Sequence, residues 1–352
     1  MTARMRQAVL SAPRSLELRE VEIPTPGSGE LVVRVDLALT CGTDLKTYRR
    51  GHPKLPFPTL LGHEYTGTVA RVGAGVSAFR EGDPIVAAPS APCGDCSRCA
   101  RGLENLCQHI DGSTMAFGAF ADYLLLPAHV VRRNVFHRPV GLPLSTCALL
   151  EPLACVVAGV ERLDLTHTET ALVMGAGPIG LLYVSLLKQR GVRVAMLGKR
   201  PRRLAAAKAL GADLVLDLAQ LEGDVPQAVR EAVGGEGPCT VVECVGRPVA
   251  WEQAVAMVRA GGEALFYGGC PGGSTVALDT RRVHYDALTL KGAFHFTPGD
   301  VRRALDLLVR GALDLTPLVT GETPLSALAE TLESLSNGAD EVKLAVVPGN
   351  DA

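Results

Sequence analysis

A glycine-rich turn between an apolar segment and a helix-like segment constrains the fold of this 352-residue chain more than any other feature. The run V-M-G-A-G-P-I-G contains Gly175, Gly177 and Gly180 in the spacing G-x-G-x-x-G. These glycines allow a tight turn, a close approach of the backbone to a pyrophosphate, and close packing of helix on strand. The turn therefore predicts a dinucleotide at the N-terminus of the helix.

Strand-like and helix-like segments alternate from Thr170 onward, which predicts a parallel, doubly wound α/β sheet. The expected strands of this sheet are 171–174, 192–197, 214–217, 240–245 and 263–269, and the expected helices are 179–190 and 201–210. After Asp286 we expect a helix at 300–310 and a final strand at 341–347, in a tail that returns to the first domain. Before Thr170 the pattern is different. Apolar and polar residues alternate in short runs broken by proline and glycine, which predicts a β-rich domain.

Four cysteines lie within 15 residues in the spacing C-x2-C-x2-C-x7-C, namely Cys93, Cys96, Cys99 and Cys107. Four thiolates in this spacing can converge on one tetrahedral cation, and neighbours this close do not easily pair as disulfides. Two disulfides or four unrelated thiols are the alternatives. We expect a zinc site, closed by four sulfur ligands and therefore structural, in a lobe at 91–108 without a core of its own.

A second group of possible ligands is dispersed along the chain. Cys41 follows the strand-like segment 31–35, and His63 stands beside Glu64. Alone, such a cysteine is usually a small buried hydrophobe and such a pair can be a surface accident, but together they are the ligand types of a catalytic zinc site with an open position. Glu151 begins an apolar helix-like run; it could face this metal, or simply be favoured at a helix N-terminus.

The end of the second predicted strand departs from the pattern of an NAD site. An acidic residue is expected about 20 positions after the glycine turn, where it accepts from the ribose 2′-hydroxyl. This chain has Gly198 there, and the cations that follow are Lys199, Arg200, Arg202 and Arg203. They can pair with a 2′-phosphate, whereas a merely solvated basic helix start is disfavoured by the helix dipole. We therefore expect NADP(H) rather than NAD(H).

Composition limits the class of protein. The length suggests two domains, and 47% apolar with 20% charged residues fits a globular chain. A net charge of −2 gives no reason to expect nucleic acid or an anionic membrane as partner. No run approaches the roughly 20 apolar residues of a membrane span, and no signal peptide is evident. The metal-like spacing among ten cysteines favours a thiol-reducing, cytoplasmic setting.

Taken in order, these motifs resemble the zinc-containing medium-chain dehydrogenases, with the closest likeness to the branch of sorbitol and threonine dehydrogenases. C-G-T-D, G-H-E-x-x-G-x-V, the four-cysteine lobe, E-P-L-A and G-A-G-P-I-G cover nearly the whole chain. The resemblance implies a GroES-like catalytic domain at 1–150 and 287–352 and a Rossmann NADP-binding domain at 151–286. It also implies a homodimer or homotetramer.

The resemblance further implies a catalytic zinc held by Cys41 and His63, with Glu64 and Glu151 as the remaining ligands, one of them exchanging with water or acting through it. Glutamate at position 151 looks like the polyol branch. Thr43 matches the hydroxyl that passes the substrate proton onward. Zinc in such a site acts as a Lewis acid on an alcohol or ketone, while hydride moves between the carbinol carbon and the nicotinamide.

The residues expected to bind the cofactor are Gly175, Gly177, Pro178, Ile179, Gly180, Lys199, Arg200, Arg203 and Val245. Asp44 and His295 are expected at the substrate. His295 stands where sorbitol dehydrogenases place an arginine that contacts substrate hydroxyls, although a packed, hydrogen-bonded histidine is the alternative. Its context F-H-F-T-P is similar to that of aminocyclitol dehydrogenases such as 2-deoxy-scyllo-inosamine dehydrogenase.

Three functions stay open on the sequence. The preferred one is a zinc- and NADP(H)-dependent oxidoreductase acting on a secondary alcohol or ketone of a small-molecule polyol, sugar or cyclitol. The second is a threonine- or amino-alcohol-type dehydrogenase, since that branch shares C-G-T-D and E-P. The third is a zinc-ribbon binding module with a redox-sensing Rossmann domain, but the lobe has only the cations Arg98 and Arg101 and no aromatic residue for base stacking.

Overall fold

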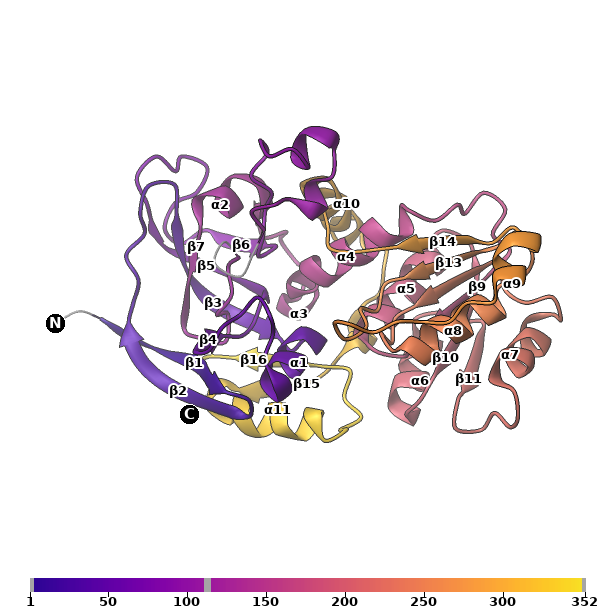
Figure 1. Cartoon of the computed structure of the whole chain (residues 1–352). Helices are drawn as coiled ribbons and strands as arrows, with labels where there is room; N and C mark the ends of the chain where they lie inside the picture. Colours follow the sequence, from indigo (N-terminus) through magenta and orange to yellow (C-terminus); the bar gives the residue numbers. More distant parts are fainter. Residues whose placement is uncertain (1–2, 111–114, 350–352) are drawn as a thin grey trace. The chain divides into compact units, whose positions relative to one another are not determined.

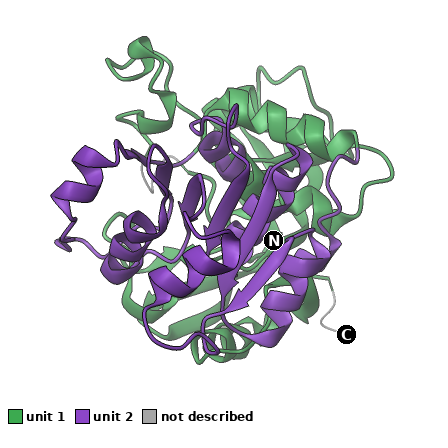
Figure 2. Ribbon diagram, turned by 90° about the vertical axis from the view of Figure 1, so that its right-hand side faces the viewer, with its two compact units in different colours: residues 1–154, 296–310, 319–352 green, residues 155–295, 311–318 purple. Residues whose placement is uncertain are grey.

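The computed structural model (Figure 1) describes residues 3–110 and 115–349 of the chain. These divide into two compact units, drawn in different colours in Figure 2. Unit 1 comprises Met1–Ala154, Phe296–Arg310 and Val319–Ala352, and unit 2 comprises Cys155–His295 and Gly311–Leu318. No helix in the described ranges is both long enough and apolar enough to cross a bilayer.

Unit 1 is rich in β-structure, as the alternating pattern predicts. Its strands are β1 (Arg4–Ala12), β2 (Ser15–Glu22), β3 (Leu31–Leu39), β4 (Thr59–Leu60), β5 (Glu64–Val72), β6 (Pro84–Ala87), β7 (Tyr123–Leu126), β8 (Val135–His137), β15 (Val319–Pro324) and β16 (Lys343–Val347). One sheet has the order β2-β1-β4; the other has the order β15-β16-β3-β5-β6-β8, with β7 paired to β3. Side chains two positions apart in a strand share a face, so Leu31, Val33 and Val35 of β3 all pack into one hydrophobic core.

The helices of unit 1 are α1 (Gly42–Arg50), α2 (Ala128–Asn134), α3 (Leu144–Ala148), α10 (Pro298–Val309) and α11 (Leu328–Ser336), and α4 (Leu150–Val160) runs from unit 1 into unit 2. The start of α10 shows why these sequences form helices. The Thr297 hydroxyl accepts from the Asp300 N–H at 3.2 Å, and Pro298 occupies the first helical position. The helix expected at 300–310 thus begins two residues earlier.

Unit 2 is built on a single parallel sheet, which confirms the predicted doubly wound fold. Its strands are β9 (Thr170–Met174), β10 (Arg193–Gly198), β11 (Leu214–Asp217), β12 (Thr240–Glu243), β13 (Glu263–Phe266) and β14 (Thr289–Gly292), and its helices are α5 (Pro178–Gln189), α6 (Pro201–Ala209), α7 (Val225–Val233), α8 (Pro248–Met257) and α9 (Thr280–Tyr285). The strand order is β11-β10-β9-β12-β13-β14. The order reverses direction at β9, and ligands of such sheets bind at the carboxyl ends of the strands beside this point.

The second boundary between the units lies later than the expected residue 286. β14 pairs in parallel with β13, with Thr289 opposite Glu263, so the segment up to His295 extends the sheet of unit 2. Unit 1 also extends to Ala154 rather than 150. The difference arises because L-T-L-K-G forms a strand at the sheet edge, and its pairing depends on a partner that is distant in sequence.

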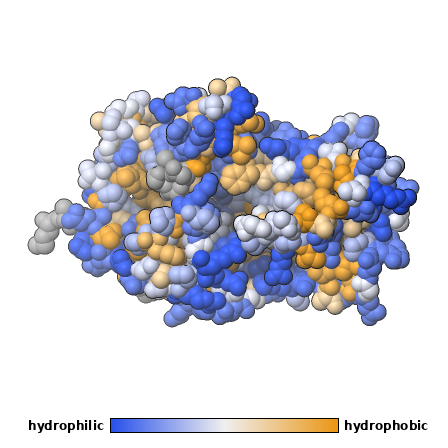
Figure 3. All heavy atoms as spheres, viewed as in Figure 1, coloured by the Kyte–Doolittle hydropathy of each residue, from blue (hydrophilic) through white to orange (hydrophobic). Residues whose placement is uncertain are grey.

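Large hydrophobic side chains are exposed on unit 2, and Figure 3 shows apolar residues gathered on the face of this unit that it presents. Among the described residues of unit 2, the large hydrophobic side chains that are exposed are those of Val245, Val249, Tyr285 and Phe294. Such surfaces often mark interaction sites. The expected homo-oligomer is compatible with this surface and stays a prediction.

Candidate functional site

The four cysteines of the lobe come together around two short 3₁₀ turns: Cys93 and Cys96 precede η1 (Cys99–Arg101), Cys99 begins it, and Cys107 follows η2 (Glu104–Leu106). The Sγ atoms of Cys96 and Cys99 are 3.5 Å apart, as are those of Cys93 and Cys107. The pairs Cys93–Cys99 and Cys96–Cys107 are at 3.9 Å, and all four thiols are free. Four thiolates at about 2.3 Å from zinc form a tetrahedron with edges of about 3.8 Å, so this donor set fits zinc.

Backbone groups also favour charged sulfur in the lobe. The N–H groups of Cys93 and His109 donate to the Cys107 sulfur, each at 3.4 Å. The Gln108 backbone N–H lowers the pKa of Cys96 to about 6, whereas burial raises that of Cys99 to about 12. Thiolates this close repel one another, and a divalent cation offsets that repulsion.

A second donor group lies where β3 ends and β5 begins. Leu39 of β3 pairs with Glu64 of β5, and Cys41 immediately precedes α1. The antiparallel register therefore brings donor atoms of Cys41, His63 and Glu64 within 4.8 Å of one another. His63 is 5% exposed and Glu64 is fully buried. Burial raises the pKa of the Cys41 thiol, and the Glu64 carboxylate raises it further.

The carboxylate of Asp44 contacts this donor group. It accepts from the backbone N–H groups of Cys41 and Gly62, both at 3.0 Å, and lies 3.4 Å from Nδ1 of His63. Burial disfavours a charged His63, but Asp44 and then Cys41 outweigh it and raise the His63 pKa well above its ordinary value. A carboxylate at Nδ1 leaves Nε2 for a metal. The sequence analysis expects Asp44 at the substrate; in the structure it is 1% exposed with both oxygens at these groups, and its contact with substrate stays a prediction.

Glu151 and Thr43 are the two other residues that the sequence analysis expects at this site. Glu151, in the first turn of α4, is 8% exposed. Among the described residues, the clustered donors are Cys41, His63 and Glu64, and Glu151 is not in that group. Thr43 lies in the first turn of α1 and is half-buried. The expected roles of Glu151 and Thr43 stay predictions.

Lys343 is a residue of this site that the sequence did not point out. It begins β16, is 1% exposed, and its Nζ lies 2.5 Å from Oε2 of Glu64. Burial lowers the pKa of Lys343, but the neighbouring Glu64 and Cys41 outweigh burial and raise it. The available signal was a single cation inside the otherwise apolar strand K-L-A-V-V.

The glycine turn joins β9 to α5 in unit 2. Gly175 has φ of 99°, and a Cβ on Gly180 would lie 2.0 Å from the Gly175 carbonyl oxygen. A Cβ on Gly177 would meet nothing within 4 Å, so space is open beside this N-cap. Pro178 and Ile179 form the first turn of α5, and Val245 lies against Gly175. Backbone N–H groups at a helix N-terminus next to open space form an anion site suited to a pyrophosphate.

Gly198 ends β10 and packs directly under this turn. A Cβ there would lie 2.6 Å from Cβ of Ala176. A side chain of any size at position 198 therefore displaces the glycine turn. Arg200, at the N-cap of α6, has φ of 76°, and strain of this kind in a non-glycine residue is concentrated at functional sites. Lys199 is exposed and Arg203 half-buried beside it.

His295 follows β14 and so lies on the carboxyl side of the sheet, as the glycine turn does. It is half-buried and has φ of 60°. A histidine held in this region costs about 1 to 3 kcal/mol, which indicates a local constraint. Its contact with substrate stays a prediction.

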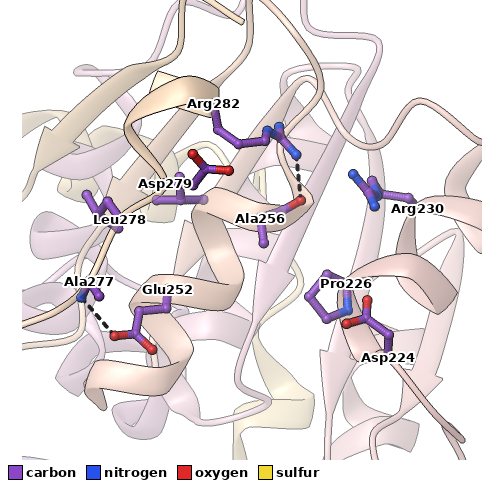
Figure 4. A pocket seen from close by; sticks show the side chains of 10 residues that line it. Asp224, Pro226, Arg230, Glu252, Ala256, Ala277, Leu278, Asp279 and Arg282 are labelled. Atoms are coloured by element: carbon purple, nitrogen blue, oxygen red, sulfur yellow. Dashed lines mark hydrogen bonds between the residues drawn. The ribbon is translucent and has the colours of Figure 1, made fainter. Parts of the chain in front are cut away.

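A pocket of about 400 Å³ in unit 2 lies elsewhere (Figure 4). Its charged groups serve internal contacts: Glu252 accepts from the Ala277 N–H at 2.9 Å, Asp279 accepts from the Arg281 N–H at 2.9 Å, and Arg282 donates to the Ala256 carbonyl at 3.0 Å. None of the site residues expected from the sequence lines it. We do not assign it to the functional site.

Two family models match this chain. Residues 27–134 match the alcohol dehydrogenase GroES-like domain, and residues 178–310 match the zinc-binding dehydrogenase domain. The first covers both donor clusters, and the second begins at the helix that follows the glycine turn.

Curated relatives and solved structures are similar over almost the full length. The chain is 33% identical to D-altritol 5-dehydrogenase of Agrobacterium fabrum, over 88% of this chain and 90% of that protein. It is 32% identical to L-threonine 3-dehydrogenase of Bacillus velezensis, over 91% and 92%. A zinc-binding dehydrogenase of Sinorhizobium meliloti 1021, solved bound to NADP, superposes with a TM-score of 0.89 at 30% identity, covering 99% of this chain and all of that one.

Proposed function

This chain belongs to the family of zinc-binding alcohol dehydrogenases, and on that premise we propose that it transfers hydride between NADP(H) and a secondary alcohol or ketone. The observation that carries the proposal is the buried donor group of Cys41, His63 and Glu64. One thiolate, one imidazole and one carboxylate fit a catalytic zinc with a position left for substrate. The family membership removes the support for a zinc-ribbon binding module.

The chain's own residues then have distinct tasks. Cys41, His63 and Glu64 would hold the zinc, and Asp44 keeps the imidazole of His63 in the orientation that a ligand needs. When bound, zinc supplies Lewis acidity toward the substrate oxygen, and the nicotinamide supplies or accepts the hydride. Thr43 would hold the hydroxyl proton of the substrate and pass it toward solvent. The four cysteines of the lobe would hold a second, structural zinc.

The preference for NADP(H) is supported by shape as well as by charge. An acidic residue at position 198 would overlap Ala176 in the glycine turn, so the ribose carboxylate of an NAD site has no room there. Lys199, Arg200 and Arg203 stand at the start of α6, where a helix N-terminus adds to their attraction for a 2′-phosphate.

Steady-state kinetics with the two cofactors tests this preference. We expect a KM for NADP at least about tenfold below that for NAD. Arg203→Ala should raise the KM for NADP by about ten- to a hundredfold, the equivalent of one charge-assisted hydrogen bond, and leave the KM for NAD unchanged. Arg193→Ala, at the exposed opposite end of β10, is the matched control. A lower KM for NAD in the wild-type protein would refute the proposal.

The substrate class we propose is a polyol, sugar or cyclitol. Glu151 in place of a cysteine and the names of the altritol and sorbitol dehydrogenases among the relatives support it. A threonine-type substrate is the alternative, supported by the relatives that act as L-threonine 3-dehydrogenases. A panel of polyols, cyclitols and L-threonine with purified protein separates the two, since oxidation of threonine without any polyol would favour the alternative.

A further inference from the structure

The buried lysine beside the metal-donor group has no assigned task in the reaction. Lys343 and Glu64 are each 1% exposed at the side chain and form an ion pair inside unit 1. Taking two charges out of water costs several kcal/mol per ion, and hydrophobic residues of the same volume are often more stable in such positions. Stability alone therefore gives a weak reason for this pair.

The contacts of Lys343 link the two chain segments that carry the donors. Its Nζ donates to Oε2 of Glu64, the neighbour of His63, and to the carbonyl oxygen of Thr40 at 3.1 Å, the neighbour of Cys41. One ammonium group thus connects segments that are more than 20 residues apart in the chain.

The backbone of β16 fixes where this ammonium group can reach. The Leu344 N–H donates to the Thr40 hydroxyl at 3.0 Å, and the Thr40 N–H donates to the Leu344 carbonyl at 3.0 Å. Ala345 pairs with Leu39, which in turn pairs with Glu64. The backbone of Lys343 is therefore held in register with the donor group by three adjacent strands.

The two oxygens of Glu64 differ as a result. Oε2 is engaged by Lys343, whereas Oε1 is buried and accepts no hydrogen bond from any residue in the described ranges. A carboxylate anchored through one oxygen presents the other in a fixed direction, and a buried oxygen without a donor is suited to a cation.

We infer that Lys343 is a positioning residue that anchors Glu64 through Oε2, presents Oε1 to the metal and offsets one negative charge of the donor set. The inference rests on the proposed function. When ionised, Cys41, Glu64 and the Asp44 carboxylate beside His63 carry three negative charges, of which a divalent cation offsets two and the ammonium group offsets the third. Without it, the excess negative charge weakens the metal as an electrophile, and the freed Oε2 can also bind, which occupies the position meant for substrate.

The test is the visible absorption spectrum of the Co²⁺-substituted protein, because cobalt bands report coordination number and ligand field. Lys343→Met should shift the bands of the site formed by Cys41, His63 and Glu64, here called the dispersed site. It should also lower kcat by about ten- to a hundredfold, with KM within about threefold. Lys343→Arg should restore both. The four-cysteine lobe contributes equally to every spectrum, so difference spectra isolate the second site.

Two further variants make the test decisive. Lys291→Met breaks the less buried pair of Lys291 with Glu263, 2.6 Å apart in unit 2, and should leave the cobalt spectrum and kcat unchanged. If Lys343→Met does not fold, Lys343→Gln keeps hydrogen-bond donors without the charge and should still shift the bands. A wild-type cobalt spectrum and kcat in folded Lys343→Met or Lys343→Gln overturns the inference. Shifted bands in a protein that oxidises no substrate of the panel would refute the proposed function and leave the inference standing.

Discussion

The two donor clusters of unit 1 are built in opposite ways. The lobe draws all four donors from 15 consecutive residues, and its cysteines pack with little besides Ile110. The dispersed site draws Cys41 from the segment between β3 and α1, His63 from the residue before β5 and Lys343 from β16, next to a large hydrophobic core. Local spacing therefore forms the lobe, with a cation as its centre, whereas the sheet forms the dispersed site. The lobe should depend on its metal for structure, and the dispersed site should not.

The largest effect is expected on activity when the dispersed site loses a ligand. Cys41→Ser should lower kcat/KM by a hundredfold or more, since Lewis-acid stabilisation amounts to several kcal/mol and about 1.4 kcal/mol corresponds to a factor of ten. Elemental analysis should find bound zinc reduced from two to about one per chain, with the melting temperature within about 2 °C. Cys239→Ser, a buried thiol outside both clusters, should retain activity within about threefold. An active Cys41→Ser would contradict the assignment.

A ligand change in the lobe should affect structure more than chemistry. Cys96→Ser should also release one zinc, lower the melting temperature by roughly 5 °C or more, and open the lobe, because metal binding replaces a core there. Trypsin should then cut after the exposed Arg98 and Arg101 much faster than in the wild-type protein. If Cys96→Ser keeps both zincs and resists trypsin like the wild type, the contrast between the two regions fails.

The smallest effect is expected from a contact between α1 and α11, remote from the donor atoms of the dispersed site. The Tyr48 hydroxyl on α1 donates to Glu333 on α11 at 3.0 Å, and this contact is the main cause of the lowered pKa of Glu333. Tyr48→Phe should lower the melting temperature by about 1 to 3 °C at neutral pH and leave the zinc of the lobe in place.

The pH dependence of this small effect follows from the direction in which the pKa of Glu333 is shifted. A carboxylate whose folded-state pKa lies below its ordinary 4.5 contributes stability above that value, and the contribution is lost as the pH falls through the lowered pKa. The difference between wild type and Tyr48→Phe in urea unfolding should therefore be full at neutral pH and shrink below pH 4.5. A difference that stays constant into the acid range would argue against the Glu333 contact.

Much of the fold could be predicted from the sequence because it depends on short-range patterns. The predicted strand at 214–217 coincides with β11, and the helices predicted at 179–190 and 201–210 match α5 and α6 within a residue. Hydrophobic periodicity and turn glycines act over a few residues, so these elements can be predicted without a structure. The pairing of β14 with β13 cannot be predicted from such patterns, because it depends on a partner strand that is distant in sequence.

The sequence by itself determined the two kinds of domain, the glycine turn and the four-cysteine spacing, since each depends on residues that are neighbours in the chain. Only the tertiary structure decided that Asp44 supports His63, that Glu151 lies outside the clustered donors, and that Lys343 is paired with Glu64. The physical reason is that a buried charge acquires its role from the groups packed around it. In this protein those groups come from strands nearly 300 residues apart along the chain.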